Sequence, residues 1–566
     1  MGIPSYFSYI IKNHSNIIRN LKRHSATRFS SLYMDCNSII YDCVRKLEHT
    51  VSSADATFES QLIDSVIAKI EYYVSVIRPS NVLHIAFDGV APFAKMEQQR
   101  VRRYKTGYLA SSQVTGEGGT SAKWNTSAIT PGTNFMNVLS AKVRRAFLGS
   151  GRGFGLRTII VSASDKAGEG EHKMFQYMRE NALQNETIAV YGLDSDLIML
   201  SLFHCFACEN IHIFRESPAF GKALLNGEID ENELIFLDNR ALAGAILKEM
   251  GIGATETGHA RSRIYDYIFM CFLLGNDFLP HFPALNIRTH GNFTLLETYQ
   301  RVIGNRPDRG FISVESGNIQ WRWVKLFLKE LAKQEHRCIS EEYASRAKLE
   351  ARHYPTSTKE EREVAFDNIP VIYRAEEHYV NPREKGWETR YYRAAFHLDK
   401  APEKGMKNDF VQNVCQNYLE GLEWVFKYYT EGCPHWRWRY AFHYPPLFSD
   451  LVNYVPDFET EFITGKEGIN RPFQQQTQLA YVIPQWNHHL LSSKMRAIID
   501  KCGVNKYYEQ CRDLKFQWMF CRYFWESHAV LKELPFNELE RMDQMHITDT
   551  YSGIPGTIDK RDRVVN

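Results

Sequence analysis

The sequence predicts an α/β fold in which a parallel sheet is flanked by helices. Short apolar runs alternate with longer helical patterns through the first third of the chain, and three of these runs end at an aspartate. Such alternation is typical of a parallel sheet covered by helices. The runs expected to form strands are Ser31–Met34, Val82–Phe87, Thr158–Val161 and Ile188–Leu193.

The chain of 566 residues is too long for one hydrophobic core. The α/β pattern occupies residues 1–320, and a charged helical region follows from Trp321 to about residue 410. Residues 411–547 begin with a helical pattern and continue into an aromatic, proline-punctuated segment. We expect residues 548–566 to form a loose tail. A stretch rich in Gly, Ser and Thr, residues 106–133, predicts a mobile surface loop that leaves directly from a basic cluster.

The overall charge gives no general affinity for polyanions. The net charge is +2, from 68 basic and 66 acidic side chains. A nucleic-acid site must therefore be a local basic patch. No segment has about 18 uninterrupted apolar residues, so we expect no membrane span.

The 11 cysteines are odd in number and irregularly spaced, and no cleavable signal sequence is evident. This pattern predicts reduced thiols in an intracellular protein. We expect a cytoplasmic location in preference to a nuclear one. Cys205 and Cys208, beside His204, suggest a zinc site, but a second pair of ligands is lacking. We interpret them as buried strand cysteines.

Carboxylates follow three of the predicted strands. Asp35, Asp88 and Asp194 come at the ends of these runs, and Asp196 is two residues further on. Ligands of an open parallel sheet bind at the carboxyl ends of its strands, so these side chains should converge. Any one such aspartate is usually a turn or a helix cap. Their joint placement is what indicates a site.

Two further segments add carboxylates to the same edge. Glu169 and Glu171 lie in AGEGEHK, just before a predicted helix, and Asp277 lies in GNDFLP, after an apolar helical run. Like charges this close repel one another unless cations intervene. Oxygen-only ligands favour Mg²⁺ or Mn²⁺, and two such ions would suit hydrolysis at phosphorus.

Several blocks together resemble the Xrn family of 5′→3′ exoribonucleases. MGIPSYF, YMDCNSIIYDC, AFDGVAPFAKMEQQRVRRYKT, ITPGTNFM, GEGEHK, YGLDSDLIML and CFLLGNDFLPHFP resemble its first conserved region. GLEWVFKYYTEGCPHWRWRYAFHYPPLFSDL resembles the second. The matches run in the family's order over most of the chain, to about Asp450.

The resemblance implies a fold similar to PIN and flap-endonuclease nucleases, with a second conserved region that braces the active site. It also implies a two-metal site that serves both binding and catalysis. The metal ligands carried over are Asp35, Asp88, Glu169, Glu171, Asp194, Asp196 and Asp277. With all seven present, we expect an active nuclease that uses two Mg²⁺ or Mn²⁺ ions.

A basic helical face follows Asp88 and suggests the choice of substrate. Lys95, Gln99, Arg102 and Arg103 are spaced at i, i+4, i+7 and i+8, which places them on one face of a helix. Such a face is often merely solvated. The resemblance implies instead that these residues bind a 5′-terminal monophosphate, for which the arginine fork is well suited.

Aromatic side chains are expected to stack on the terminal bases. The resemblance places one at Tyr41, where the family has histidine, and the other at Trp438 or Trp436. The sequence does not distinguish the two tryptophans, and a core position is equally compatible with either.

The chain lacks the family's C-terminal extension domains and its CCHC knuckle, so it resembles a compact form from a virus or a divergent eukaryote. A viral enzyme of this kind could be packaged in the particle. Partner proteins are not indicated, and we expect a monomer.

The predicted function is RNA decay, by processive 5′→3′ degradation of single-stranded, 5′-monophosphorylated RNA to mononucleotides. The alternatives are a flap or DNA 5′-nuclease, and a catalytically silent protein that binds RNA ends.

Overall fold

The computed structural model describes most of the chain. The described residues are 2–3, 5–21, 27–113, 123–148, 154–181, 185–208, 210–218, 233–252, 259–313, 315–398, 404–464, 470–510, 513–551 and 564–565. Within them, no helix is both long and apolar enough to span a bilayer.

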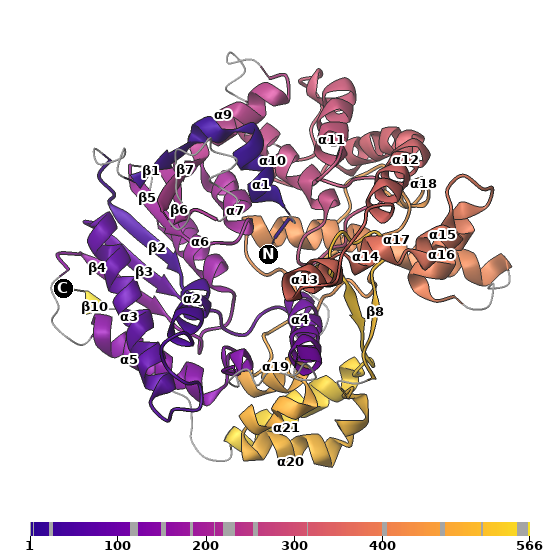
Figure 1. The fold of residues 1–566 in the computed structure, drawn as a ribbon. Helices are drawn as coiled ribbons and strands as arrows, with labels where there is room; N and C mark the ends of the chain where they lie inside the picture. The colour runs from indigo at the N-terminus through magenta and orange to yellow at the C-terminus, as the bar shows by residue number, and fades with distance from the viewer. Residues whose placement is uncertain are drawn as a thin grey trace.

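The first half of the chain and the C-terminal strand β10 form an eight-stranded sheet of order β1-β7-β6-β5-β2-β3-β4-β10 (Figure 1). The strands are β1 (Ile18–Asn20), β2 (Ser31–Asp35), β3 (Val82–Ala86), β4 (Thr158–Ser162), β5 (Thr187–Tyr191), β6 (Asn210–Glu216), β7 (Leu234–Asp238) and β10 (Val564–Val565). The four strands expected from the sequence are all present, with ends shifted by no more than two residues.

The predicted parallel sheet is confirmed at its centre, where β6, β5, β2, β3 and β4 run parallel. The edges differ, because β7, β1 and β10 pair antiparallel. Antiparallel edge strands are common on otherwise parallel sheets. Chain order reverses around β2, which lies between β3 and β5. The carboxyl end of β2 is therefore the topological switch point at which ligands of such sheets bind.

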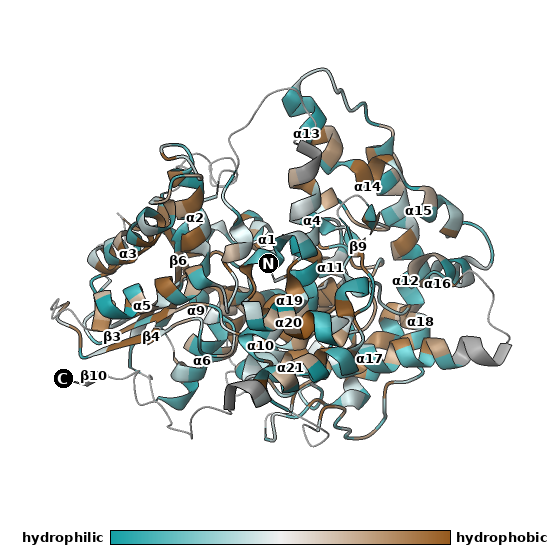
Figure 2. Cartoon of the chain, turned by 90° about the horizontal axis from the view of Figure 1, so that it is seen from below, coloured by the Kyte–Doolittle hydropathy of each residue, from teal (hydrophilic) through white to brown (hydrophobic). Residues whose placement is uncertain are grey.

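Side chains that alternate along the strands divide the core into two layers. Leu32 and Met34 of β2 pack on one face of the sheet, and Tyr33 packs on the other. Helices whose buried residues share the first face are α2 (Asn37–Leu47), α3 (Phe58–Ile77) and α5 (Asn134–Leu148). Helices on the second face are α1 (Tyr6–Asn13), α6 (Gly170–Glu180), α7 (Asp196–His204), α9 (Asn239–Glu249) and α10 (Ala260–Cys271). In Figure 2 the strands β3 and β4 are largely brown, as expected for a strand buried on both faces.

The second half of the chain is mostly helical, as predicted. Its helices are α11 (Gly291–Tyr299), α12 (Trp321–Glu350), α13 (Lys359–Asp367), α14 (Ile369–Ile372), α15 (Ala375–Val380), α16 (Trp387–Phe396), α17 (Lys404–Thr430), α18 (Phe448–Leu451), α19 (Gln475–Val482), α20 (Ser493–Cys502) and α21 (Phe536–Tyr551). Figure 1 shows α17 crossing the middle of the molecule beside the chain's N-terminus. A two-stranded sheet is formed by β8 (Lys515–Gln517) and β9 (His528–Val530).

Two expectations about flexible segments need correction. The mobile loop predicted for residues 106–133 is wrong at both ends, because α4 (Phe93–Gln113) continues into it and Ala128 and Ile129 are buried in the core. Arg103 fixes the second end, since its Nη2 donates to the Ile129 carbonyl at 3.0 Å. Residues 114–122 of that stretch lie outside the described part.

The tail expected to be loose from residue 548 is ordered at its two ends. Helix α21 continues to Tyr551, and Val564–Val565 pairs with β4. Residues 552–563 lie outside the described part.

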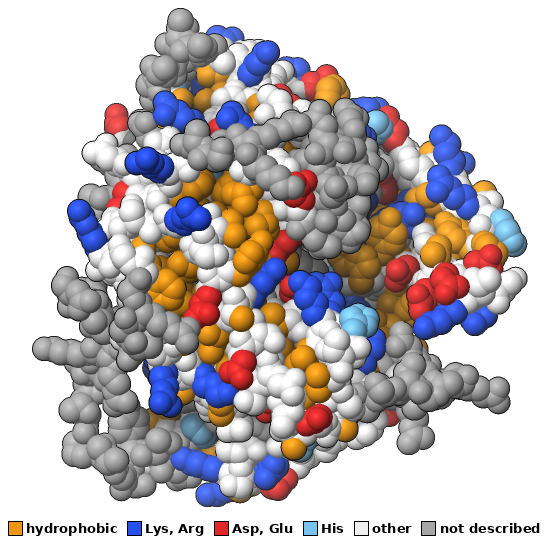
Figure 3. Space-filling view, turned by 60° about the vertical axis from the view of Figure 1, so that its left-hand side comes forward, with side chains coloured by type: hydrophobic (Ala, Val, Ile, Leu, Met, Phe, Trp, Pro, Cys, Tyr) orange, Lys and Arg blue, Asp and Glu red, His pale blue; other side chains and the backbone are white. Residues whose placement is uncertain are grey.

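The ten cysteines among the described residues form no disulfide, and Cys205 and Cys208 are buried. Cys205 follows α7, and the Cys208 thiol lies 3.8 Å from the Glu186 carbonyl oxygen. Basic and acidic side chains are interspersed on the face shown in Figure 3, in agreement with the near-neutral net charge.

Candidate active site

The carboxyl ends of the central strands carry a cluster of acidic side chains. Oxygen atoms of Asp35, Asp88 and Glu171 all lie within 4.8 Å of one another. Asp35 is the last residue of β2, Asp88 follows β3, and Glu171 is in the first turn of α6. Three segments remote in sequence thus meet where the sequence predicted.

Gly170 permits this close approach. A Cβ atom at that position would lie 2.6 Å from Asp35 Oδ1 and 3.5 Å from Asp88 Oδ1. Its backbone N–H donates instead to Asp88 Oδ1 at 2.7 Å. Asn37, at the start of α2, donates its Nδ2 to the other Asp88 oxygen at 2.6 Å. The glycine between the two glutamates is therefore a requirement of the site.

Glu169 and Asp277 are joined by a lysine. The Lys95 ammonium lies 2.6 Å from Glu169 Oε1 and 2.5 Å from Asp277 Oδ2. Against the effect of burial, Lys95 lowers the pKa of Asp277. Asp277 follows a sharp turn at Gly275, which adopts a φ of 85°. A residue predicted to bind phosphate thus pairs with two predicted metal ligands.

Asp196 and Asp194 complete the set. Asp196 begins α7 and is 5% exposed, and its pKa is raised to about 6, chiefly by burial and next by Asp277. Asp194 precedes it in the loop after β5 and is exposed. All seven acids predicted from the sequence therefore lie at or beside the same end of the sheet.

The electrostatics of the cluster indicate a need for cations. Burial raises the pKa of Asp35 well above its ordinary value, and Asp88 and Asp194 add to the effect. The pKa of Glu171 is raised in the same way by burial and by Glu169. Within the described residues, Asp35 Oδ1 is buried and has no hydrogen-bond partner. An orphaned oxygen among carboxylates fits a hard divalent cation.

Two tyrosines that the sequence analysis missed hold the acids from the other side. The hydroxyl of Tyr428 donates to Glu169 Oε2 at 2.7 Å, and that of Tyr429 donates to Asp196 Oδ1 at 2.7 Å. Both tyrosines lie in α17 and are buried. Periodicity cannot reveal them, because buried tyrosines in a helix are ordinarily core residues.

The backbone of Gly2 is a second feature that the sequence analysis missed. A Cβ atom at Gly2 would lie 2.2 Å from Asp196 Oδ1, and Gly2 adopts a φ of 55°. Ser195 Oγ donates to the Ile3 carbonyl at 3.3 Å. The first residues of the chain therefore lie against the acidic cluster.

The predicted phosphate-binding residues lie in α4, but they differ in environment. Gln99 and Arg103 are buried, Arg102 is exposed, and Lys95 points to the acids. Arg102 is close enough to the cluster to lower the pKa of Asp277. Gln99 Oε1 is buried without a partner among the described residues.

The predicted stacking residues are placed as follows. Tyr41 of α2 lies near Arg103. Burial lowers the pKa of Arg103 to about 10, and Tyr41 acts against this shift. Trp438 is 8% exposed and stacks on Trp424, with ring centroids 5.2 Å apart. Trp436 is half-buried, and its carbonyl accepts from the Phe93 N–H at the start of α4. Of the two tryptophans, Trp436 has the more accessible ring.

The comparisons with known proteins agree with this arrangement. Residues 1–217 match the family described as XRN 5'-3' exonuclease N-terminus. Residues 260–381 and 373–548 match the family described as Xrn1 helical domain.

Curated relatives cover most of the chain. It is 26% identical to "5'-3' exoribonuclease 2" of Gallus gallus, over 96% of this chain and 69% of the relative. It is 28% identical to "5'-3' exoribonuclease 1" of Homo sapiens, over 87% of this chain and 31% of the relative. For "5'-3' exoribonuclease 1" of Saccharomyces cerevisiae the identity is 24%, over 88% and 40%. The matched part of the chain thus spans less than half of the two longer relatives.

Proposed function

The chain belongs to the XRN family of 5′→3′ exonucleases, and from this premise we propose that it degrades single-stranded RNA from a 5′-monophosphorylated end. The observation that carries the proposal is the convergence of seven carboxylates beside the basic helix α4. An acidic site suits metal-assisted hydrolysis, and the adjacent cationic groups suit a terminal phosphate.

The acidic cluster divides into two groups that would each hold a divalent cation. Asp35, Asp88 and Glu171 form one group. Glu169 and Asp277, which Lys95 joins, would form the other together with Asp196 and Asp194. Divalent cations at such a site would lower the pKa of a water and stabilise the leaving oxygen. Oxygen-only ligands favour Mg²⁺ or Mn²⁺.

The residues of α4 would select the end of the strand. Gln99 and Arg103 are buried, so a 5′-phosphate would supply partners that a 5′-hydroxyl cannot. Buried polar groups left unpaired cost a few kcal/mol, which corresponds to roughly a hundredfold in rate. Arg102, exposed at the same helix, would meet the phosphate from the solvent side.

The direction of bond breakage accounts for repeated cycles. Water attacks the phosphorus between the first two nucleotides, and the bond to the 3′ oxygen of the first nucleotide breaks. The released product is a mononucleotide, and the shortened strand again carries a 5′-monophosphate. The same pocket then binds the new end, so degradation proceeds without a change of substrate class.

A turnover assay tests the proposal. Single-stranded RNA of one sequence is offered with a 5′-monophosphate, a 5′-hydroxyl or a 5′-triphosphate, with Mg²⁺ or with a chelator, and DNA of equal sequence is compared. We expect mononucleotides only from 5′-monophosphorylated RNA with Mg²⁺. Equal rates on 5′-hydroxyl RNA would refute the pocket, and faster cleavage of DNA would favour a DNA 5′-nuclease. Binding without turnover in any condition would indicate a silent RNA-end-binding protein.

A further inference from the structure

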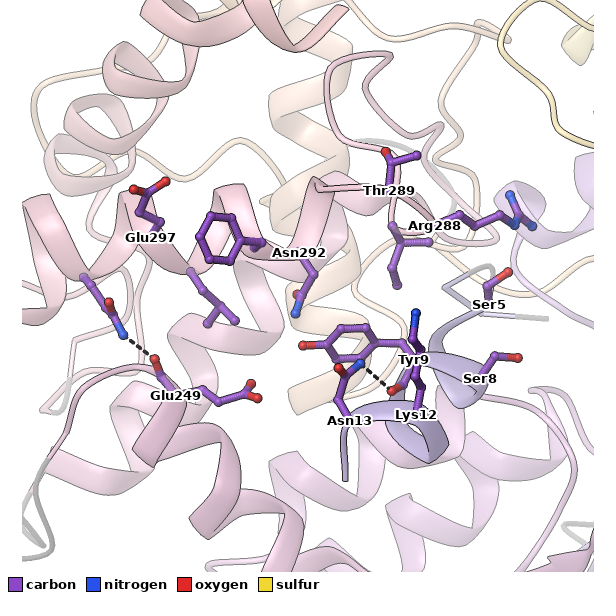
Figure 4. Close-up of a pocket in the computed structure, with 14 residues that line it drawn as sticks. Ser5, Ser8, Tyr9, Lys12, Asn13, Glu249, Arg288, Thr289, Asn292 and Glu297 are labelled. Carbon is purple, nitrogen blue, oxygen red and sulfur yellow. Dashed lines mark hydrogen bonds between the residues drawn. The ribbon is translucent and has the colours of Figure 1, made fainter. Parts of the chain in front are cut away.

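A cavity of about 770 Å³ lies between α1 and α11, outside the acidic cluster (Figure 4). It contains none of the residues predicted from the sequence to act in catalysis, phosphate binding or stacking. Its walls come from α1, from the turn before α11, from α11 itself and from the end of α9. Its chemistry therefore has to be derived from the structure.

One end of the cavity is close to the acidic cluster. Gly2 packs against Asp196, and Ser5, which lines the cavity, is three residues further along the chain. Three residues span at most about 11 Å, so Ser5 cannot lie farther than that from Gly2. A strand that leaves the acidic cluster can therefore reach this cavity.

The charges in the cavity are separated. In Figure 4, Ser5, Ser8, Lys12 and Arg288 lie toward one side. The acidic side chains Glu249 and Glu297 lie at the opposite side (Figure 4). Lys12 is exposed. A phosphate group would therefore be held at the Lys12 side, which is also the side that adjoins the acidic cluster.

Arg288 contributes to the same side of the cavity. Its guanidinium pairs with Glu526 at 2.5 Å and lies 5.6 Å from the centre of the Tyr523 ring. Because these contacts hold the side chain in place, its position is set before any ligand binds. Part of its charge is neutralised by Glu526, so Lys12 is the stronger of the two cationic groups.

Aromatic rings and an amide provide the apolar part. Phe293 lines the cavity with 67% of its surface exposed, so its ring is accessible to a ligand. Tyr9 lines the opposite wall, on α1. Two aromatic rings in a pocket with cationic groups are typical of sites where single-stranded RNA stacks its bases.

Asn292 points into the cavity toward Tyr9 (Figure 4). It is 3% exposed. The amide lies close enough to the Tyr9 hydroxyl to oppose the rise in pKa that burial causes there. A small shift of Tyr9 would free the amide to present both a donor and an acceptor to the edge of a base.

We propose that this cavity is a binding site for a downstream nucleotide of the RNA strand. Its base would lie against Phe293 and Tyr9, its edge would pair with Asn292, and its phosphate would contact Lys12. The proposal rests on the proposed function, because it assumes that the strand's 5′ end is held at the acidic cluster. Its consequence is that affinity for RNA rises when the strand becomes long enough to fill the cavity.

The experiment compares Phe293→Ala and Lys12→Ala with the parent on 5′-monophosphorylated RNA from 2 to 20 nucleotides. Loss of one stacking partner should weaken binding of long RNA roughly tenfold, measured as Kd with a chelator and as KM with Mg²⁺. Dinucleotides should be bound and cleaved as by the parent. Phe458→Ala is the control, since Phe458 is 72% exposed and does not line the cavity.

Each outcome decides the proposal. Unchanged Kd for long RNA in both variants overturns it, as does an equal loss on dinucleotides, which would indicate a distorted acidic cluster. A parent enzyme that cleaves no RNA refutes the proposed function, whereas an active parent with unaffected variants refutes only this site. AMP is titrated against labelled long RNA as a further arm. If AMP displaces long RNA from the parent and this displacement is lost in Phe293→Ala, the cavity binds the released mononucleotide. That result would overturn the assignment to the downstream strand.

Discussion

The acidic cluster and the basic face of α4 adjoin each other, but they are built differently. The acids come from the ends of three strands, from the start of α6 and from the loop after α10, so only the complete fold brings them together. The basic and amide groups all come from a single helix. Asp88, Glu169 and Asp196 accept hydrogen bonds from other elements, whereas the groups of α4 divide among several partners.

The contacts of each side chain show which acidic and basic groups are already paired within the fold and which remain exposed. Tyr428 and Asn37 fix Glu169 and Asp88 through hydrogen bonds. In α4, Arg103 is held by a backbone carbonyl and Lys95 by two carboxylates, so Arg102 is the exposed cation of the predicted set. Part of the acidic cluster is therefore held by the fold itself, and the basic face is divided between structural contacts and the exposed Arg102.

Loss of one acid should have the largest effect. We expect Asp194→Ala to reduce hydrolysis of 5′-monophosphorylated RNA by roughly a thousandfold or more, because it removes one of the proposed metal ligands. Initial rates at saturating Mg²⁺ measure the effect.

The control for this variant is its stability. Melting without divalent cations should be unchanged or slightly lower, because the N-terminal amine lowers the pKa of Asp194 and its charge is therefore stabilised in the folded protein. Turnover close to that of the parent would show that Asp194 is not part of the catalytic unit.

A pH effect on stability should come next, about 3 kcal/mol for Asp196. The ordinary pKa of an aspartate carboxyl is 3.8. In the folded protein the pKa of Asp196 is raised to about 6, mainly because the side chain is buried. The folded protein thus holds this proton more tightly than the unfolded chain, so the stabilisation is present below pH 4 and is lost as pH rises through about 6. Melting of the metal-free protein, measured from pH 4 to pH 7, reports the loss.

Other carboxylates titrate in the same range, so the comparison is made with Asp196→Asn. The difference in melting temperature between parent and variant isolates this group. We expect the melting temperature of the variant to rise relative to that of the parent as pH increases. At pH 7, Mg²⁺ should raise the melting temperature of the parent again by binding the folded state. If the melting temperature of the parent instead rose relative to that of the variant as pH increased, the raised pKa assigned to Asp196 would be contradicted.

The exposed cation of α4 is tested by Arg102→Ala. We expect the rate on 5′-monophosphorylated RNA to fall roughly 30- to 100-fold, while the slow rate on 5′-hydroxyl RNA changes little. The ratio of the two kcat/KM values measures the loss of discrimination. Arg337→Ala, an exposed arginine of α12, is the control. An undiminished ratio would mean that other groups recognise the phosphate.

The sequence predicted the sheet and the acids for the same physical reason. A strand buried on both faces is a short apolar run, and its carboxyl end is where an exposed polar residue can follow. Asp35, Asp88 and Asp194 carry that signal directly. The antiparallel edges carried no comparable signal, because β1 and β10 have three and two residues. The residues after Thr106 were misjudged because their composition resembles a loop, while burial of Ile129 and a bond from Arg103 order the segment.

Positions in the tertiary structure set the rest of the site. Helical spacing placed Lys95 and Arg103 on one face correctly, but it could not show that Lys95 reaches across to Asp277. Tyr428 and Tyr429 are indistinguishable in sequence from core tyrosines, and only the docking of α17 makes them partners of the acids. The cavity between α1 and α11 likewise exists only after distant segments meet.

Lys95 links the two regions, and its removal should strengthen metal binding. In the folded protein its ammonium compensates Glu169 and Asp277, so a divalent cation must compete with it. We expect Lys95→Gln to bind Mn²⁺ about tenfold more tightly in calorimetry, and to bind a 5′-phosphorylated RNA more weakly. Weaker Mn²⁺ binding would show that Lys95 supports the metal site instead.

The smallest effect should come from the hydroxyls that fix the acids. Tyr428→Phe and Tyr429→Phe each remove one hydrogen bond to a carboxylate and leave the buried ring in place. A bond of this kind contributes about 1 kcal/mol, so we expect Mn²⁺ affinity and the Mg²⁺ concentration at half-maximal rate to worsen about fivefold, with little change in kcat at saturation.

The matched control is Tyr418→Phe in the same helix. Its buried hydroxyl donates to the Pro280 carbonyl at 3.1 Å and contacts no acid of the cluster, so its loss has a similar cost to folding. If α17 merely packs against the sheet, all three variants should melt earlier and bind metal like the parent. If the two tyrosines position Glu169 and Asp196, only their variants should need more Mg²⁺, and saturating Mg²⁺ should restore their rates because the cation then orders the carboxylates. Equal metal requirements in the three variants would leave α17 a structural helix.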